Sequence, residues 1–151
     1  MKPTLIRFRP PRIAMFLLGV AALLHWMTPL GQVTIVPSAW LGIGTAVAGF
    51  AIMIHGWWQF RRDDVAICPT AATNKLLTDG IYRVTRNPMY LGILMMLAGI
   101  GIWFGTLPFA LATIGWWVVI RFAFCPYEER KLEQTFGGDY RRYRAHVSRW
   151  I

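Results

Sequence analysis

Residues Ala39 to Phe60 read AWLGIGTAVAGFAIMIHGWWQF, an apolar stretch without Lys, Arg, Asp or Glu. About 17 to 25 such residues form a helix that spans the hydrocarbon core of a bilayer, so the stretch predicts a transmembrane helix. Further apolar stretches lie near residues 13–30, 88–104 and 107–124. The predicted fold class is all-α: residues 1–151 form one polytopic membrane domain, a bundle of four transmembrane helices with C-terminal interfacial amphipathic helices.

The composition supports a membrane protein and argues against a nucleic-acid partner. Hydrophobic residues make up 56% of the chain and charged residues 15%, whereas a soluble domain carries about a quarter charged residues. A net charge of +9 is typical of nucleic-acid binding too, but no RNA- or DNA-binding motif accompanies it, and basic residues beside apolar spans serve membrane orientation. The two cysteines, Cys68 and Cys125, belong to no CxxC or Cys/His cluster. We therefore expect neither a metal nor a disulfide framework.

The distribution of charge predicts the topology. Lys and Arg gather in the N-terminal segment, in the loop 61–87 and in the tail 125–151, whereas the connections 28–38 and 104–108 carry no charge. By the positive-inside rule, the basic segments and both termini are cytoplasmic. We expect a multi-pass protein of the bacterial cytoplasmic membrane, with its first span uncleaved because no convincing signal-peptide cleavage site follows it.

Small residues in two of the predicted spans indicate close helix packing. Gly42, Ala46 and Gly49 share one face of the second span, and Gly92 and Gly99 do so in the third. The string GIGTAVAG resembles a dinucleotide-binding loop only superficially, because it lies inside an apolar span with no strand before it. We expect a packing role for it.

The first candidate site stretch, TDGIYRVTRNPMYLG (residues 78–92), leads into the third predicted span. Asn87–Pro88 is a good pair for the N-cap and first turn of that helix. A helix N-terminus presents free N–H groups to an anion, and Arg86 with the hydroxyls of Tyr82 and Tyr90 would add donors. A helix cap with tyrosines at the membrane interface is the alternative reading of the same residues.

The second candidate stretch, RFAFCPYEERKLEQTF (residues 121–136), predicts an interfacial amphipathic helix. Gly137 and Gly138 should break it, and Asp139 can cap a last, basic helix lying on the membrane. The apolar face of that helix would consist of Tyr140, Tyr143, Val147 and Trp150. Glu128 and Glu129 are either site residues or a solvated pair that balances nearby cations.

Together, the pattern GxYxxxRNPxYxG at 80–92 and the pattern EExxLxxxFGxxYxxYxxxV at 128–147 resemble the isoprenylcysteine carboxyl methyltransferase family. The resemblance covers roughly the C-terminal half of the chain. It implies that the cytoplasmic ends of the last helices and the C-terminal segment bind S-adenosylmethionine. It also implies a lipophilic small-molecule acceptor that enters from the bilayer, among the membrane lipids.

The resemblance also implies particular cofactor contacts. The family's tyrosine before its RHPxY motif corresponds to Tyr82, the motif itself continues from Asn87 to Tyr90, and the first glutamate of the EE pair corresponds to Glu128. The segment upstream of the first motif also lines the family's cofactor site. The implied cofactor-binding residues are Leu76, Leu77, Tyr82, Arg86, Asn87, Pro88, Met89, Tyr90, Glu128 and Glu129.

Two positions depart from the family pattern. Asn87 replaces the motif histidine and retains hydrogen bonding, but it cannot take up a proton. Phe124 replaces an arginine that the family uses in handling the substrate. Arg121 lies seven residues before Glu128, about 20° away around an ideal helix, so we expect it to position the acceptor as the catalytic candidate. Snorkelling to headgroups, or pairing with a glutamate, is its alternative role.

The expected function is methyl transfer from S-adenosylmethionine to a carboxyl, thiol or amine of a lipophilic small molecule. Attack on a sulfonium methyl requires alignment and dehydration more than a strong acid or base, which an enclosed interfacial site supplies. One alternative is a sterol-reductase-like NADPH enzyme, because such proteins resemble this family around the RxPxY motif. The other is a non-catalytic membrane binding protein of the same fold.

Overall fold

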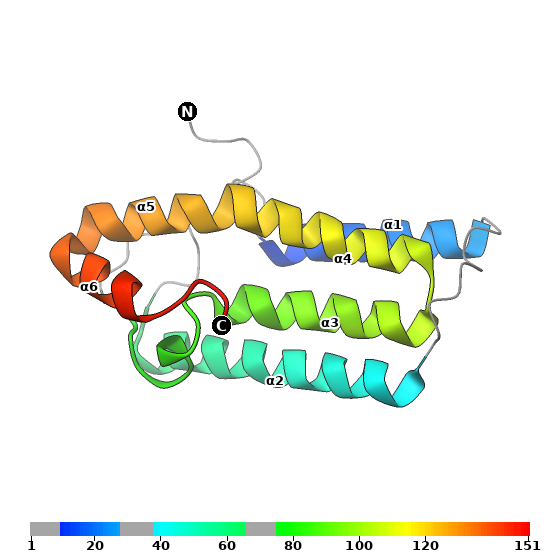
Figure 1. Ribbon diagram of the computed structural model, residues 1–151, viewed down its shortest axis with the longest axis horizontal. Helices are drawn as coiled ribbons and strands as arrows, with labels where there is room; N and C mark the ends of the chain where they lie inside the picture. Colours follow the sequence, from blue (N-terminus) through cyan, green and yellow to red (C-terminus); the bar gives the residue numbers. More distant parts are fainter. Residues whose placement is uncertain (1–9, 28–37, 66–74) are drawn as a thin grey trace.

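Figure 1 shows the computed structural model, which describes residues 10–27, 38–65 and 75–151. Within these ranges the regular structure is helical and contains no strand, which confirms the all-α fold class. In chain order, the elements are α1 (Pro10–Met27), α2 (Ala39–Arg62), η3 (Gly80–Arg83), α3 (Pro88–Phe104), α4 (Leu107–Val119), η4 (Ile120–Phe124), α5 (Cys125–Phe136) and α6 (Gly138–His146).

Three of the described helices are long and apolar enough to cross a membrane: α1, α2 and the continuous helix Leu107–Phe136 formed by α4, η4 and α5. The apolar helix α3 has 17 residues, so it rises only about 26 Å against a hydrocarbon core of about 30 Å. The expected membrane bundle is present, with one short helix. The sidedness of the termini stays a prediction. The basic residues before Pro10, the connection 28–37 and Cys68 lie outside the described residues.

In the bundle, α3 lies between α2 on one side and α4 on the other, and α1 packs against α4 (Figure 1). Trp116, Ile120 and Phe124 share one face of the long helix and are fully buried. They form the main hydrophobic core with Tyr90, which stands in the first turn of α3. The core therefore holds the beginning of α3 against the middle of the long helix.

The contact between α2 and α3 is made through glycines. A Cβ atom on Gly42 would lie 2.7 Å from the carbonyl oxygen of Gly99, and one on Gly49 would lie 2.6 Å from the carbonyl oxygen of Gly92. Because a side chain at these positions would overlap the facing helix, the two backbones can approach closely only with glycine there. The predicted small-residue packing is confirmed, and GIGTAVAG is part of this contact.

Helix α5 follows the fourth predicted span without a break in the helical backbone. The connection is η4, a π-helical turn in which the backbone N–H of Cys125 donates to the carbonyl of Ile120. Pro126, which has no N–H to donate, follows at once. A π turn holds one residue more than an α turn and so shifts the following positions by about 100° around the axis. The prediction that Arg121 and Glu128 share a face is therefore wrong.

The long helix ends where the sequence predicts a break. Gly137 adopts a φ of +51°, and α6 begins at the next residue. The N-cap position of α6 belongs to Gly137 itself, so the prediction that Asp139 caps this helix is wrong. Asp139 lies in the first turn, where its carboxylate pairs with Arg142 at 2.7 Å.

The aromatic face of α6 contacts the protein, although the sequence favours contact with lipid. Tyr140 is buried, and the hydroxyl of Tyr143 donates to the backbone carbonyl of Tyr82 at 2.7 Å. The helix ends at His146, so Val147 and Trp150 belong to a non-helical tail segment, residues 147–151. The partners of this face come from other parts of the folded chain. The helical periodicity of the sequence does not reveal them.

Candidate functional site

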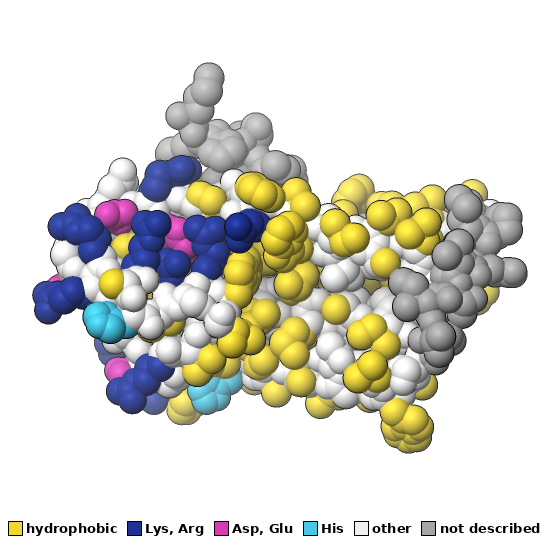
Figure 2. Space-filling view, in the orientation of Figure 1, with side chains coloured by type: hydrophobic (Ala, Val, Ile, Leu, Met, Phe, Trp, Pro, Cys, Tyr) yellow, Lys and Arg dark blue, Asp and Glu magenta, His cyan; other side chains and the backbone are white. Residues whose placement is uncertain are grey.

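A cavity of about 430 Å³ lies at the end of the bundle where α5, α6 and η3 meet. This volume falls in the range of small-molecule sites, about 300 to 1,000 Å³. The cavity is bounded by the start of α1, the end of α2, the segment from Lys75 to Tyr90, α5 and α6. Figure 2 shows that Lys and Arg side chains gather over this end, while most of the coloured side chains elsewhere on the visible face are hydrophobic.

The structure brings all the expected cofactor residues to this one cavity. Its lining includes Leu76, Leu77, Tyr82, Arg86, Asn87, Pro88, Met89, Tyr90, Glu128 and Glu129. These residues come from two stretches that are distant in sequence, residues 76–90 and 128–129. The lining also includes Tyr140 and Tyr143, which stand in the second motif although the sequence argument placed them on a membrane-facing surface.

Glu128 and Tyr90 form a direct contact between α5 and α3. The Tyr90 hydroxyl donates to Oε1 of Glu128 at 2.5 Å. The apolar part of the long helix ends at Phe124, and Glu128 lies beyond that part. Burial raises the pKa of the Glu128 carboxyl to about 7. The hydrogen bond from Tyr90 and the charge of Lys131 oppose this rise. The carboxylate therefore changes charge near neutral pH.

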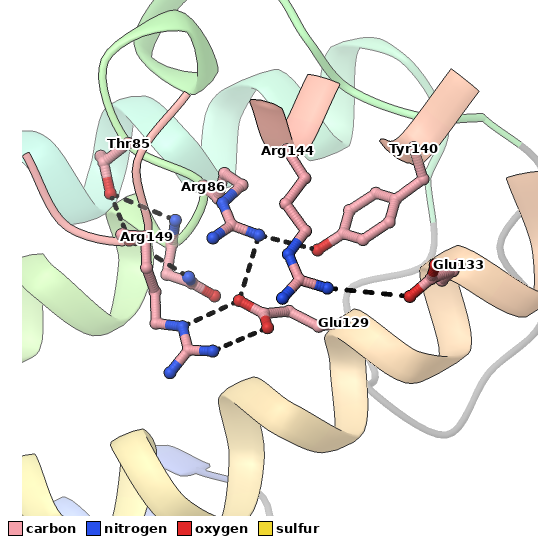
Figure 3. Close-up of polar contacts among 8 residues, drawn as sticks. Thr85, Arg86, Glu129, Glu133, Tyr140, Arg144 and Arg149 are labelled. Atoms are coloured by element: carbon pink, nitrogen blue, oxygen red, sulfur yellow. Dashed lines mark hydrogen bonds and ion pairs between the residues drawn. The ribbon is translucent and has the colours of Figure 1, made fainter. Parts of the chain in front are cut away.

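Glu129 is held by two arginines (Figure 3). The guanidinium of Arg149 donates to both carboxylate oxygens at 2.7 and 2.8 Å, a bidentate geometry. Nη1 of Arg86 lies 3.1 Å from Oε1 of the same carboxylate and also donates to the hydroxyl of Tyr140 at 3.1 Å. Glu129 thus lines the cavity with its charge compensated by protein groups. The sequence argument missed Arg149, because no motif marks it.

Asn87 stands at the N-cap position of α3, but its side chain does not cap the helix. Its Nδ2 donates instead to the backbone carbonyl of Arg149 at 3.2 Å, and the Thr85 hydroxyl donates to the same carbonyl at 3.0 Å. The predicted side-chain cap is therefore wrong. The asparagine that replaces the family's histidine ties the start of α3 to the tail segment.

The turn that carries Tyr82 is fixed by Gln59, which the sequence argument also missed. Nε2 of Gln59 donates to the carbonyl of Asp79 at 3.1 Å, and its Oε1 accepts from the N–H of Ile81 at 3.2 Å. Gly80 between them has a φ of +57°, a conformation that side chains disfavour. The end of α2 thereby holds η3, and Tyr82 with it, at the cavity.

Arg121 is absent from the residues that line the cavity. Its guanidinium carbon lies 5.4 Å from the ring centroid of Trp117 and 5.7 Å from that of Phe122. Phe124, at the family's arginine position, is fully buried in the core beside Tyr90. Neither position supplies a cation to the cavity, and the η4 turn explains why Arg121 points elsewhere.

Comparison with known proteins points to a methyltransferase family. The phospholipid methyltransferase family matches residues 37–139, more than half of the chain. An uncharacterized protein of Haemophilus influenzae is 38% identical over 63 residues, which make up 42% of this chain and all of that protein. No solved structure matches. Together with the apolar helices, the family match indicates an integral membrane protein with membrane methyltransferase activity. The chain belongs to the phospholipid methyltransferase family, within the isoprenylcysteine carboxyl methyltransferase-like group of membrane methyltransferases.

Proposed function

We propose that this protein transfers a methyl group from S-adenosylmethionine to a lipophilic acceptor in the cavity. The observation that carries the proposal is the convergence of both motif stretches on one space of suitable volume. The positive-inside pattern predicts that this end of the bundle is cytoplasmic, where a soluble donor is available. An apolar acceptor would then reach the same space from the bilayer.

The polar part of the lining suits the donor. Glu128 offers a carboxylate to a cationic ligand, and the hydroxyls of Tyr82 and Tyr90 lie in the same lining. Arg86 offers a cation to a ligand carboxylate, and its Nε is buried without a hydrogen-bond partner among the described residues. A buried donor left unpaired costs about 1 to 3 kcal/mol, which a ligand oxygen would relieve.

The apolar part of the lining suits a lipophilic acceptor. It includes Met53, Ile54 and Trp57 from α2, Ile93 from α3 and Leu132 from α5. In the transfer, a nucleophilic carboxyl oxygen, thiol sulfur or amine nitrogen bonds to the methyl carbon as the bond from carbon to the sulfonium sulfur breaks. The protein contributes alignment of the two groups and exclusion of water. The family's name makes a membrane phospholipid the first acceptor to test.

Ligand binding to the purified protein in lipid nanodiscs tests the proposal. We expect calorimetric binding of S-adenosylmethionine and none of NADPH, followed by transfer of labelled methyl into a phospholipid or another lipophilic acceptor. Binding of NADPH alone would favour the reductase-like alternative. Binding of neither ligand by folded protein would favour a non-catalytic role.

A further inference from the structure

The tail segment, residues 147–151, joins the two stretches that line the cavity. The backbone N–H of Arg86 donates to the carbonyl of Ser148 at 3.1 Å. The next carbonyl, that of Arg149, accepts from Thr85 and Asn87 at 3.0 and 3.2 Å. The tail thus holds residues 85–87 through its backbone and, through the Arg149 guanidinium, holds Glu129 of α5.

We infer that Arg149 is a positioning residue of the site, which acts through Glu129 to set the orientation of Arg86 toward the cavity. The role of Arg149 in binding the donor rests on the proposed function. The contacts that link the tail segment to residues 85–87 and to Glu129 do not. Arg149 itself is absent from the cavity lining, while Arg86 and Glu129 both belong to it. Its effect on a ligand must therefore pass through these neighbours.

Charge and geometry explain why a second arginine is needed. Within the described part of the chain, Oε1 of Glu129 contacts both Arg86 and Arg149, while Oε2 contacts Arg149. With Arg149 in place, Arg86 approaches one oxygen and keeps a second contact to the Tyr140 hydroxyl. Without the Arg149 guanidinium, both carboxylate oxygens of Glu129 could bind Arg86 in a bidentate ion pair. That pair would move the Arg86 guanidinium away from the Tyr140 hydroxyl.

The tail is anchored independently of this ion pair. Trp150 packs against the core cluster that contains Tyr90, Phe124 and Cys125. A substitution of the Arg149 side chain therefore removes the guanidinium while the tryptophan and the backbone carbonyls remain. This separation makes Arg149→Met a specific test of the ion pair, and a chain ending at Val147 a test of residues 148–151.

The first experiment compares the affinity of S-adenosylmethionine in variants reconstituted in nanodiscs. We expect Arg149→Met to weaken binding at least tenfold. Arg149→Lys should recover part of this loss, because a lysine ammonium can contact the carboxylate but cannot form the bidentate pair. The matched control is Arg142→Met, since Arg142 is exposed and, among the described residues, forms its ion pair with the neighbouring Asp139. Its affinity should stay within twofold of wild type.

A double variant distinguishes positioning from a general loss of stability. If Arg149 acts through Glu129, then Arg149→Met should add less than twofold to the loss already caused by Glu129→Gln. Additive losses, or unchanged affinity in Arg149→Met, would overturn the positioning role. If Arg149→Met fails to fold, the same comparison with Arg149→Lys decides.

Hydrogen exchange gives a readout that needs no donor. The N–H of Arg86 is bonded to the tail, so peptides covering residues 84–90 should exchange faster in the chain ending at Val147 than in wild type. Unchanged exchange would overturn the structural link. If wild-type protein fails to bind S-adenosylmethionine while this exchange difference is present, the proposed function fails and the link between tail and site stands.

Discussion

Glu128→Gln tests the donor site most directly. The glutamine retains the shape of the side chain and an oxygen that can accept from Tyr90, but it removes the negative charge. A hydrogen bond to a charged group contributes about 1.5 to 3 kcal/mol, so the affinity for S-adenosylmethionine should fall roughly 10- to 150-fold. The loss should be smaller for S-adenosylhomocysteine if Glu128 faces the sulfonium, because that product carries no charge on sulfur.

Isothermal titration calorimetry in nanodiscs provides the assay, with thermal unfolding measured on each variant. Glu133→Gln is the matched control, because Glu133 lies on the same helix, is partly exposed and, in the ranges that the structure describes, pairs with Arg141 and Arg144 at 3.8 and 3.7 Å. Equal affinity of the Glu128 and Glu133 variants, both folded, would remove Glu128 from the donor site and refute the reasoning.

Three further outcomes are expected. Gly49→Leu should lower the free energy of unfolding by about 1 to 3 kcal/mol or more, because its Cβ would lie 2.6 Å from the Gly92 carbonyl oxygen. Gly44→Leu is the control: a Cβ there meets open space, so its thermal unfolding should match that of wild type. Because burial raises the pKa of Glu128 to about 7, its ionised fraction falls about tenfold from pH 8 to pH 6, and calorimetric donor affinity should fall by about as much; a flat profile would contradict this. Arg121→Met should leave donor affinity and turnover unchanged, since Arg121 stacks on rings outside the cavity; lower turnover with intact binding would restore its predicted role.

Those parts of the fold that depend on local sequence could be predicted. The third span begins at Pro88 and ends at Phe104 in both the sequence argument and the structure, because a proline-marked start and a left-handed glycine at 105 bound it. The glycine contacts of α2 and α3 follow from spacing alone. The expected cofactor residues could be named because the family resemblance implies them, and the structure places all of them in the cavity lining.

The remaining features depend on tertiary contacts or on a change of helical register. A single extra residue in the η4 turn rotates Glu128 away from the face of Arg121, and hydrophobicity patterns do not reveal such a turn. Gln59 and Arg149 act on segments some twenty or more residues away. The aromatic periodicity of α6 was visible, but whether lipid or protein covers that face depends on how the chain folds back after Gly137.

The two adjacent glutamates serve different purposes, which a motif alone cannot separate. Glu129 is buried and bound by two arginines, so its charge is compensated by the protein, and its loss would leave two partly buried cations without this carboxylate. Glu128 accepts a hydrogen bond from the neutral hydroxyl of Tyr90, and burial raises the pKa of its carboxyl to about 7. A cationic donor next to Glu128 would favour the ionised form, so binding should take place with release of a proton near pH 7. Calorimetry in buffers of different ionisation enthalpy measures that proton, and its absence in Glu128→Gln, with its retention in Glu133→Gln, would assign it to this carboxyl.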